Sequence, residues 1–587
     1  MLRRIAGRLL VHALLLVGAA VVAAPLLLTG SWHRSHEELR YLVLADLFAR
    51  AVHDGIPYPR FLPDLYGGYG YPTFCFYQPG FFWLATLFAA LPLSLHHALQ
   101  LAVVCLLYVG ALGAFRLGDV LAKRRWAFFA AFLFLLTPYL FVDLYVRGDL
   151  SEAMALLLGP WLFALLVNLD RRLAHGSAPA LAMVGLAASV AAMVLAHPAP
   201  PLALLPALAA TAVVLAWGVP HGRALLLRAA ASIAAGIALA APYWAALLAL
   251  RGRVGFDRLV GGYYAPEVHG AAAWQLVSNA WGFGGSTAGA ADDGMSLQLG
   301  AVHLALALIG GVAGRRSRVV RVASGAYALL VLLVLDVASP IWALAGPLRL
   351  FQFPWRLLAA TATLQLVAAL GLRAWTASLP PRSEAALLAG LALVALGWHA
   401  DQFAVAGATR DPAEILRDYH ARVKRKTFEH FAFRDEFTPR AAMRGPAGPR
   451  DPDQPAVRLE GQGAIRALPG ASPHRLRVEL AVPAPTAVVI EQLYLPGWEV
   501  VLDGRELPRA ALDGSLTAEG FVRLALPQAG THRLEAAYGE PPGGAVRAAG
   551  MAAALAVFAA LLRRPRGAAP ASGASGSVPP RAGHSTT

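Results

Sequence analysis

Twelve runs of mostly apolar residues are spread along this chain, and each is long enough to cross a lipid bilayer as a helix. Backbone polar groups find no water inside a bilayer, so a spanning run must satisfy them within its own helix. The composition agrees, because 57% of the 587 residues are hydrophobic and only 14% are charged. A soluble protein of this length needs more charged surface than these residues supply. The runs lie near residues 10–29, 97–118, 126–144, 153–169, 178–196, 200–218, 229–250, 298–313, 320–337, 356–374, 385–404 and 543–562.

Clusters of basic residues indicate how these helices are oriented. The formal net charge is +15, which in a soluble protein would suggest a nucleic-acid partner. In a membrane protein, lysine and arginine collect instead in the short cytoplasmic loops. With the N-terminus inside, every alternate loop is arginine-rich, as at Lys123-Arg124-Arg125 and Arg171-Arg172. The pattern predicts a multi-pass membrane protein with both termini in the cytoplasm and no nucleic-acid partner.

One apolar stretch, at residues 79–93, does not fit as a span. Counted as one, it would place Lys123-Arg124-Arg125 outside and invert the rest of the chain. It is also short, so we expect an interfacial or re-entrant segment on the outer face. The predicted membrane region covers residues 1–404 with eleven spans, and its outer loops lie at residues 30–96, 145–152, 251–297 and 338–355.

Residues 405–541 depart from the membrane composition. Period-two alternation, as at residues 475–482, together with Asp-Gly and Pro-Gly turn pairs, predicts β-strands. We expect an extracytoplasmic β-rich domain of the sandwich class, which serves in binding or positioning because it carries no catalytic constellation. The last span follows at residues 542–563, and the Ala/Gly/Pro/Ser-rich residues 564–587 are expected to form a disordered cytoplasmic tail.

The first outer loop carries a histidine and a carboxylate at the start of a predicted amphipathic helix. Ser35 followed by Glu38 is a capping box, which gives Glu38 a structural role. His36 and Glu37 have two interpretations. They form a solvated helix start favoured by the helix dipole, or they form a base at the membrane surface that could also bind a divalent metal carrying a phosphate.

A segment rich in proline, glycine and tyrosine follows at residues 55–72. Proline and glycine exclude a helix in this segment. The rings of Tyr69 and Tyr71 suit a rigid loop at the membrane interface, and they suit stacking on the face of a sugar equally well. Both interpretations stay open on the sequence alone.

Other ionisable residues gather at the outer ends of predicted spans. Arg147, Asp149 and Glu152 share one short loop, where unpaired charge is costly, and Arg147 could hold a phosphate oxygen as a planar fork. His197 alone is more typical of a satisfied interfacial histidine, whereas Arg356 could snorkel or bind an anionic lipid headgroup. All of these residues lie on the same side of the membrane. This indicates an outward-facing polar site at the lipid boundary, since a transport path places ionisable residues in the middle of spans.

Several short motifs together carry a family resemblance. They are His36-Glu37, Tyr58-Pro-Arg60, Gly67-Gly-Tyr-Gly-Tyr-Pro72, Tyr145-Val-Arg-Gly148 with Glu152, Trp281-Gly-Phe-Gly284, Ser296-Leu-Gln-Leu-Gly300, Phe353-Pro-Trp-Arg356 and Leu495-Pro-Gly-Trp498 with Asp503-Gly504. The chain resembles bacterial membrane proteins called 6-pyruvoyl-tetrahydropterin synthase-related, which are similar to the GT-C class of glycosyltransferases and to YfhO-like membrane proteins. No pterin chemistry is implied, because the sequence lacks the histidine cluster that would bind zinc in such an enzyme.

The resemblance implies a GT-C architecture, in which an acidic residue of the first outer loop acts in catalysis and a polyprenyl-phosphate sugar is the usual donor. In this chain the acidic residue would be Glu37, with His36 assisting. A divalent metal, Mg²⁺ or Mn²⁺, is a candidate cofactor that Glu37 would hold. Arg147 and Arg356 would bind the lipid phosphate, and Glu152 would orient Arg147 or contribute to the metal site.

The expected protein is therefore a bacterial inner-membrane glycosyltransferase, which moves a sugar from a polyprenyl-phosphate donor to an extracytoplasmic glycan, lipid or protein acceptor. Tyr69, Tyr71 and His197 complete the predicted substrate-binding set. Two alternatives are a non-catalytic envelope scaffold or binding protein and a transporter of lipid-linked glycans. A catalytic site predicts a deep outer cavity in which Glu37, Arg147 and Arg356 converge. A scaffold allows them to lie far apart, and a transporter needs a polar path through the bilayer.

Overall fold

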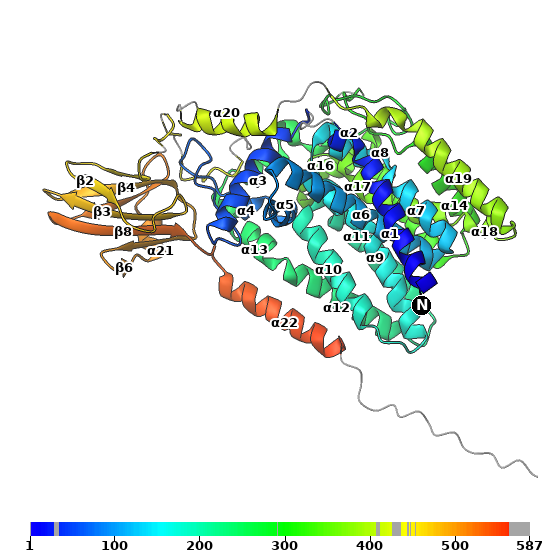
Figure 1. Ribbon diagram of the computed structural model, residues 1–587. Coiled ribbons are helices and arrows are strands. Elements are labelled where there is room, and N and C mark those ends of the chain that lie inside the picture. Colours follow the sequence, from blue (N-terminus) through cyan, green and yellow to red (C-terminus); the bar gives the residue numbers. More distant parts are fainter. Residues whose placement is uncertain are drawn as a thin grey trace, which may run out of the picture.

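The computed structural model is mostly helical, with a β-rich region at one end of the helical body (Figure 1). The predicted tail at residues 564–587 lies outside the part of the chain that it describes. The described residues are 2–28, 34–289, 292–344, 346–406, 411–424, 436–442, 445–446, 448–451 and 453–562.

The first part of the chain contains both long apolar helices and short helices. Its elements are α1 (Leu2–Val22), α2 (Ala24–Leu28), α3 (Glu38–His53), α4 (Thr73–Phe76), α5 (Gly80–Ala89), α6 (Leu95–Leu121), α7 (Arg124–Leu135), α8 (Pro138–Phe141), the π-helix η1 (Val142–Arg147), α9 (Leu150–Ala174), α10 (Ala180–Ala196), α11 (Ala199–Ala216), α12 (Gly222–Leu239) and α13 (Ala241–Leu250).

The second part of the helical region contains more short 3-10 helices, and one further helix follows the β-rich region. The 3-10 helices are η2 (Arg251–Arg253), η3 (Phe256–Val260), η4 (Gly262–Tyr264), η5 (Pro266–Val268), η6 (Asp336–Ala338), η7 (Gly346–Phe351), η8 (Pro354–Arg356) and η9 (Ala400–Phe403). The α-helices are α14 (Ala301–Ala313), α15 (Arg318–Val334), α16 (Ser339–Leu344), α17 (Leu357–Leu370), α18 (Arg373–Thr376), α19 (Pro381–Trp398), α20 (Pro412–Lys424) and α22 (Gly544–Leu562).

The predicted class of a multi-pass helical membrane protein with a β-rich region is confirmed, but the count of twelve spans is not. Within the described residues, six helices are long and apolar enough to cross a membrane, or seven if α7 and the bent segment after it count as one span. Twelve spans therefore stay a prediction. The six are Ile5–Val22, Leu95–Leu121, Leu150–Ala174, Ala199–Ala216, Gly222–Leu239 and Pro354–Thr376.

The segment predicted not to span, residues 79–93, forms the short helix α5. Its 10 residues rise by about 15 Å, roughly half the thickness of the hydrocarbon core. α5 packs against α3 and α6, and several of its aromatic and small side chains are buried there. The helix is too short to cross a bilayer, as the distribution of basic residues requires.

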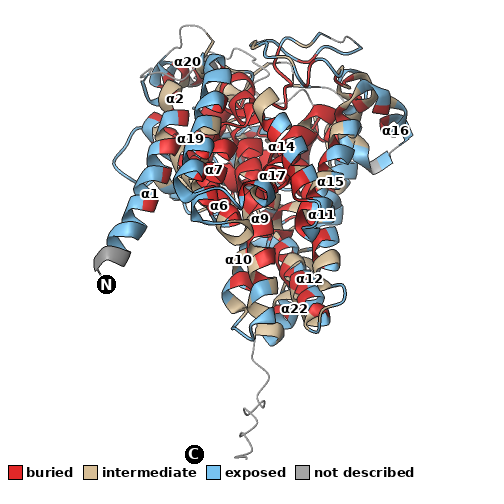
Figure 2. Ribbon diagram, turned by 90° about the vertical axis from the view of Figure 1, so that its right-hand side faces the viewer, coloured by how far each residue is buried: buried red, intermediate tan, exposed pale blue. Residues whose placement is uncertain are grey.

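The helices α9 and α17 lie at the centre of the bundle, where Figure 2 shows buried residues on both. Every residue of α17 is buried, and α9 packs against α6, α10, α11 and α17. Glycines let α6 approach α9 closely, as small residues do between membrane helices. A Cβ atom at Gly113 would lie 2.6 Å from Trp161 of α9, and one at Gly110 would lie against Leu157.

The β-rich region is a sandwich of two antiparallel sheets, as the sequence predicts. One sheet has the order β1-β4-β7 and the other the order β2-β3-β8-β5-β6. Apolar side chains from both sheets form one core, which includes Val488 and Val522 of the first and Val478 and Leu534 of the second. The strands are β1 (Val457–Leu459), β2 (Ala464–Ala467), β3 (Arg475–Val482), β4 (Thr486–Leu493), β5 (Trp498–Leu502), β6 (Arg505–Glu506), β7 (Phe521–Leu526) and β8 (Gly530–Tyr538), with the short helix α21 (Arg509–Asp513) between β6 and β7.

The sandwich docks on the first outer loop through backbone and aromatic contacts. The Leu493 N–H donates to the Tyr69 carbonyl at 2.7 Å, and the ring of Tyr69 stacks on Phe521 with centroids 5.1 Å apart. Phe61 stacks in the same way on Tyr538, at 5.3 Å. The aromatic segment of the first loop therefore holds the sandwich against the helical body.

Replacing Gly70 with alanine is expected to weaken this docking. Gly70 has φ +76°, and a Cβ atom there would lie against the Phe61 ring and the side-chain oxygen of Gln492. The matched control is Gly55→Ala, at φ +87° with open space around the site. Both variants bear the left-handed backbone strain, but Gly70→Ala should lose about 1–3 kcal/mol more because of the overlap. Thermal unfolding of both in detergent measures this difference, and equal midpoints would contradict it.

Candidate functional site

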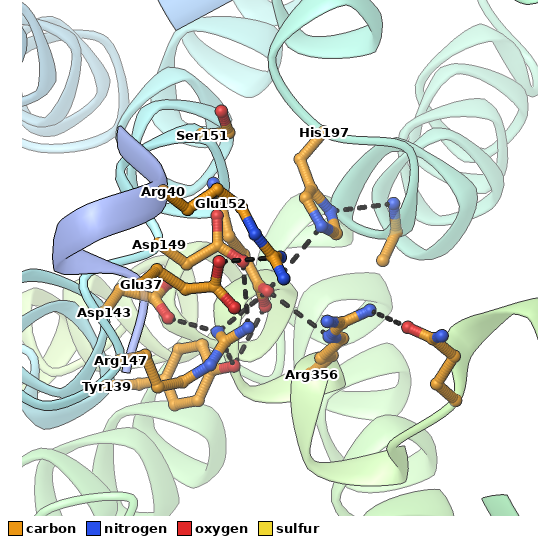
Figure 3. A network of polar contacts seen from close by, with 12 residues as sticks. Glu37, Arg40, Tyr139, Asp143, Arg147, Asp149, Ser151, Glu152, His197 and Arg356 are labelled. Carbon is orange, nitrogen blue, oxygen red and sulfur yellow. Dashed lines mark hydrogen bonds and ion pairs between the residues drawn. The ribbon is translucent and has the colours of Figure 1, made fainter. Parts of the chain in front are cut away.

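Charged side chains from five segments of the chain meet at one place in the helical body. Most of them are buried, although such groups are rarely buried without a partner. Figure 3 shows that they point toward one another. This charged cluster contains Glu37 and Arg40 at the start of α3, Asp143 and Arg147 on η1, Asp149 and Glu152 at the start of α9, His197 between α10 and α11, and Arg356 on η8.

The guanidinium group of Arg147 lies at the centre of this cluster. Its Nη2 donates to Asp149 Oδ2 at 2.9 Å, and its Nη1 donates to Glu152 Oε2 at 2.8 Å. Nη1 also donates to Asp143 Oδ1 and to the Tyr139 hydroxyl. The Arg147 side chain is only 7% exposed, and its partners Asp143, Asp149 and Glu152 are 0%, 8% and 0% exposed. Buried charges are stable only when each of them has partners at hydrogen-bonding distance, as here.

The charges around Asp149 keep its carboxyl group ionised. Burial raises the pKa of this carboxyl, but the positive charges of Arg147 and Arg356, with the hydrogen bond from the Glu152 N–H, outweigh burial and hold the pKa below its usual range. Asp149 also caps α9, because its Oδ1 accepts a hydrogen bond from the Glu152 N–H at 3.0 Å. Asp149 is therefore ionised, accepts hydrogen bonds from its neighbours and forms the N-cap of α9.

The backbone around Gly148 brings the first outer loop to the cluster. η1 is a π-helix, a form often found at functional sites, and it ends at Gly148 with φ +67°. A Cβ atom at Gly148 would collide with the Ser35 hydroxyl. Without one, the His36 N–H donates to the Val146 carbonyl at 3.0 Å and the Glu37 N–H to the Arg147 carbonyl at 2.9 Å. These two bonds hold Glu37 beside Arg147.

Two buried tyrosines, which the sequence did not single out, complete the cluster. The Tyr41 hydroxyl donates to Asp149 Oδ1 at 2.9 Å and accepts from the Ser151 N–H at 2.9 Å. The Tyr139 hydroxyl donates to Glu152 Oε1 at 2.9 Å. A tyrosine on an apolar helix face is indistinguishable from a core residue in the sequence, so no signal there could have found these two.

Glu37 lies at the accessible rim of the cluster. Its side chain is 25% exposed, whereas those of Asp143 and Glu152 are fully buried. Glu37 Oε2 lies 2.6 Å from Nη1 of Arg40. Partial burial raises the pKa of the Glu37 carboxyl, against the opposing effect of Arg40. A carboxylate with a raised pKa at an accessible position has the properties of a general base.

Arg356 is a cation at the rim that can donate further hydrogen bonds. Its Nε lies 3.6 Å from Glu152 Oε2 and, among the described residues, has no hydrogen-bond partner. Its Nη1 donates to the Gln352 side-chain oxygen at 2.8 Å. Gln352 itself has φ +63°, a left-handed conformation that costs a non-glycine residue about 1–2 kcal/mol. Such strain is often kept at functional sites, and here it positions the partner of Arg356.

The structure brings most of the predicted site residues together. Glu37, Arg147, Glu152, His197 and Arg356 belong to the charged cluster, where His197 Nε2 lies 3.8 Å from Glu152 Oε2. The three charged groups named by the catalytic hypothesis, Glu37, Arg147 and Arg356, therefore lie in one cluster and are not dispersed.

The other predicted residues lie beside the cluster or away from it. His36 adjoins Glu37, and its Nε2 donates to the Phe283 carbonyl at 3.3 Å, while burial lowers its pKa. Tyr69 stacks on the β-sandwich, and the buried Tyr71 accepts a hydrogen bond from the Phe437 N–H at 2.9 Å. Sugar binding by these two tyrosines stays a prediction.

One group of residues has the composition of a metal site. Ligand atoms of Asp149, Glu152 and His197 all lie within 4.8 Å of one another. Their hydrogen bonds, however, already use the atoms that a metal needs. Asp149 Oδ1 accepts two hydrogen bonds, and Glu152 Oε2 faces both Arg147 and Arg356. A divalent cation on that oxygen would meet two positive groups at short range.

The position of the proton on the His197 ring also disfavours metal binding. Its Nδ1 accepts a hydrogen bond from the Ala199 N–H at 3.2 Å, so a neutral ring carries its proton on Nε2. Burial lowers the pKa of His197, which favours that neutral form. The nitrogen that faces Glu152 therefore has no lone pair for a metal. Glu37, the ligand expected from the resemblance, lies beside Arg40, and the residues present do not fit a divalent metal.

Comparisons with known proteins add one structural likeness. No family model and no curated protein matches the chain. Among solved structures, the chain is similar to the cryo-EM structure of arabinofuranosyltransferase AftD from Mycobacteria, with 20% sequence identity and a TM-score of 0.41. The likeness covers 69% of this chain but only 28% of the AftD chain.

Replacing Arg147 with methionine is expected to destabilise the protein by about 3–5 kcal/mol, because three buried carboxylates would lose their cation. The control is Arg466→Met on the β-sandwich. Arg466 is 74% exposed and pairs with Glu479 at 3.6 Å, so its loss should change the unfolding midpoint little. Thermal unfolding followed by tryptophan fluorescence compares the two variants. Similar midpoints for both would show that Arg147 does not stabilise the cluster.

Proposed function

We propose that the protein is a membrane glycosyltransferase that transfers a sugar from a polyprenyl-phosphate donor to an acceptor at the outer face of the membrane. The single observation that supports this proposal is the convergence of Glu37 and Arg356 at the accessible rim of a buried charged cluster. The resemblance to GT-C glycosyltransferases, through the 6-pyruvoyl-tetrahydropterin synthase-related proteins, indicates the same class of reaction. The bacterial inner membrane is the location that this resemblance implies.

The proposed reaction is a displacement at the anomeric carbon of the donor sugar. A bond forms between the acceptor oxygen and this carbon, while the bond from the carbon to the phosphate oxygen breaks and its electron pair leaves on the phosphate. The acceptor proton passes to the carboxylate of Glu37. One base and one stabilised leaving group are sufficient for such an inverting displacement.

Glu37 is the proposed base because it combines accessibility with a raised pKa. Backbone bonds from residues 36 and 37 to the carbonyls of η1 fix its position. His36 assists by anchoring the loop through its bond to the Phe283 carbonyl. A base held in this way loses little freedom when the acceptor binds, which favours reaction.

Arg356 is the proposed ligand of the leaving phosphate. Its Nε has no hydrogen-bond partner among the described residues, and a guanidinium fork suits phosphate oxygens. Arg147 was expected to share this role, but its bonds to three carboxylates already use both of its terminal nitrogens. We propose that Arg147 instead holds Asp149 and Glu152 in place beneath the rim. No step of this mechanism requires a metal.

Replacing Glu37 with glutamine is expected to lower sugar transfer by about 100-fold or more, because the amide cannot accept the acceptor proton. The matched control is Glu414→Gln on α20, where the side chain is 63% exposed and lies 4.0 Å from Arg417. Release of polyprenyl phosphate from a panel of polyprenyl-phosphate sugars measures the activity. Full activity of Glu37→Gln would disprove the assignment of the base. A folded wild-type protein that transfers no sugar from the panel would favour a non-catalytic scaffold.

Replacing Arg356 with glutamine is expected to reduce kcat/KM for the lipid-linked donor about tenfold or more, since a hydrogen bond to a charged group is lost. Arg349→Gln is the control, because Arg349 lies in the same outer connection but pairs with Glu267 at 2.6 Å. Initial rates at varied donor concentration separate the two variants. Equal losses in both would remove Arg356 from the phosphate site.

A further inference from the structure

Three carboxylates of the charged cluster share one cation, and that cation is part of the chain. Arg147 bonds to Asp143, Asp149 and Glu152 through its two terminal nitrogens. We propose that Arg147 takes the place of a divalent metal in this cluster, and that its removal converts the three carboxylates into a metal site. This inference holds whether or not the protein transfers a sugar.

The first argument is that Arg147 uses the oxygens that a metal would need. The two oxygens of Asp149 and Glu152 that bond to Arg147 lie 2.9 and 2.8 Å from its nitrogens. The other two oxygens of this pair accept hydrogen bonds from Tyr41 and Tyr139. Every carboxylate oxygen of the pair therefore has a donor from the chain itself. A metal bound by this pair would have to displace the guanidinium group.

The second argument is the shape of the site around this cation. The guanidinium carbon of Arg147 lies 4.9 Å from the centroid of the Trp355 ring. A planar, weakly hydrated guanidinium group stacks well on an aromatic face, whereas Mg²⁺ and Mn²⁺ retain bound water and prefer oxygen on all sides. Trp355 thus suits an arginine at this position and offers nothing to a hydrated ion.

The third argument comes from His197, the neutral member of the group. Its Nδ1 accepts from the Ala199 N–H, so the nitrogen that faces Glu152 carries a proton. A protonated Nε2 complements the carboxylate of Glu152 but cannot bind a metal. Arginine, tyrosine and histidine donors therefore surround the carboxylates, and none of these groups is arranged as a metal ligand.

Removal of Arg147 should make the three carboxylates available as metal ligands. An alanine at position 147 leaves Asp143, Asp149 and Glu152 without their shared cation, in a space that the guanidinium group had filled. Three carboxylates are hard oxygen ligands of the kind that Mn²⁺ and Mg²⁺ bind. Because a ligand that binds only the folded state stabilises it, Mn²⁺ should raise the unfolding midpoint of this variant.

The experiment compares thermal unfolding of the purified wild-type protein and of Arg147→Ala in detergent, with EDTA or with 1 mM Mn²⁺. Wild type should show the same midpoint under both conditions. Arg147→Ala should gain about 2 °C or more with Mn²⁺. Potassium chloride at equal ionic strength controls for screening. The double variant Arg147→Ala/Asp149→Asn should lose the gain, because one of the three oxygen ligands becomes an amide.

Two results would overturn the proposal. One is a saturable rise in the wild-type midpoint with Mn²⁺ that Asp149→Asn abolishes, because the native cluster would then bind a metal beside Arg147. The other is a folded Arg147→Ala that does not respond to Mn²⁺. If Arg147→Ala does not fold even with Mn²⁺, Arg147→Gln, which removes the charge but keeps more of the side-chain volume, takes its place in the same comparison and is judged by the same two results. None of these readouts requires sugar transfer, so a failure here is distinguishable from a failure of the proposed function.

Discussion

The arrangement of the candidate site depends on the ion cluster around Arg147. A guanidinium group with three buried carboxylates is stable only if every partner is held at bonding distance. η1 supplies Asp143 and Arg147, and α9 supplies Asp149 and Glu152. Arg356 of η8 and His197 at the end of α10 approach the same Glu152 oxygen. The cluster thereby ties together helices that are far apart in the chain.

The cluster also positions the groups that remain accessible. Glu37 lies at the rim because its backbone bonds to the carbonyl of Arg147, in the close approach that Gly148 allows. The same first loop continues into the aromatic segment that carries the β-sandwich, through Tyr69 and Phe61. Both carboxylate oxygens of Asp149 and of Glu152 accept hydrogen bonds, whereas Glu37 Oε2 and Arg356 Nε at the rim have no hydrogen-bond partner among the described residues. The rigid buried part thus fixes the positions of the accessible groups, which is what a reaction at a membrane surface needs.

Several features of the site could not have been predicted from the sequence. Arg147 was expected to hold a phosphate, because an arginine in a short outer loop has no visible partner in a linear sequence. Its actual partners come from two adjacent elements and from Tyr139, a residue typical of an apolar core. The same holds for Tyr41, which bonds to Asp149 across 108 positions of the chain. The hydrogen bond that decides the protonated nitrogen of His197 is likewise a matter of backbone geometry.

The sequence by itself determined the class of the fold. Apolar runs form helices because a bilayer leaves the backbone no other partner, and the alternation near residue 480 forms a sandwich because period two places one face on a core. It also determined that Glu37, Arg147, Glu152 and Arg356 stand out, since charges are scarce there. Only the tertiary structure decided which of these charges neutralise one another and which remain available. Pairing depends on distances of a few ångströms between segments, and these are set by helix packing, which a local pattern does not contain.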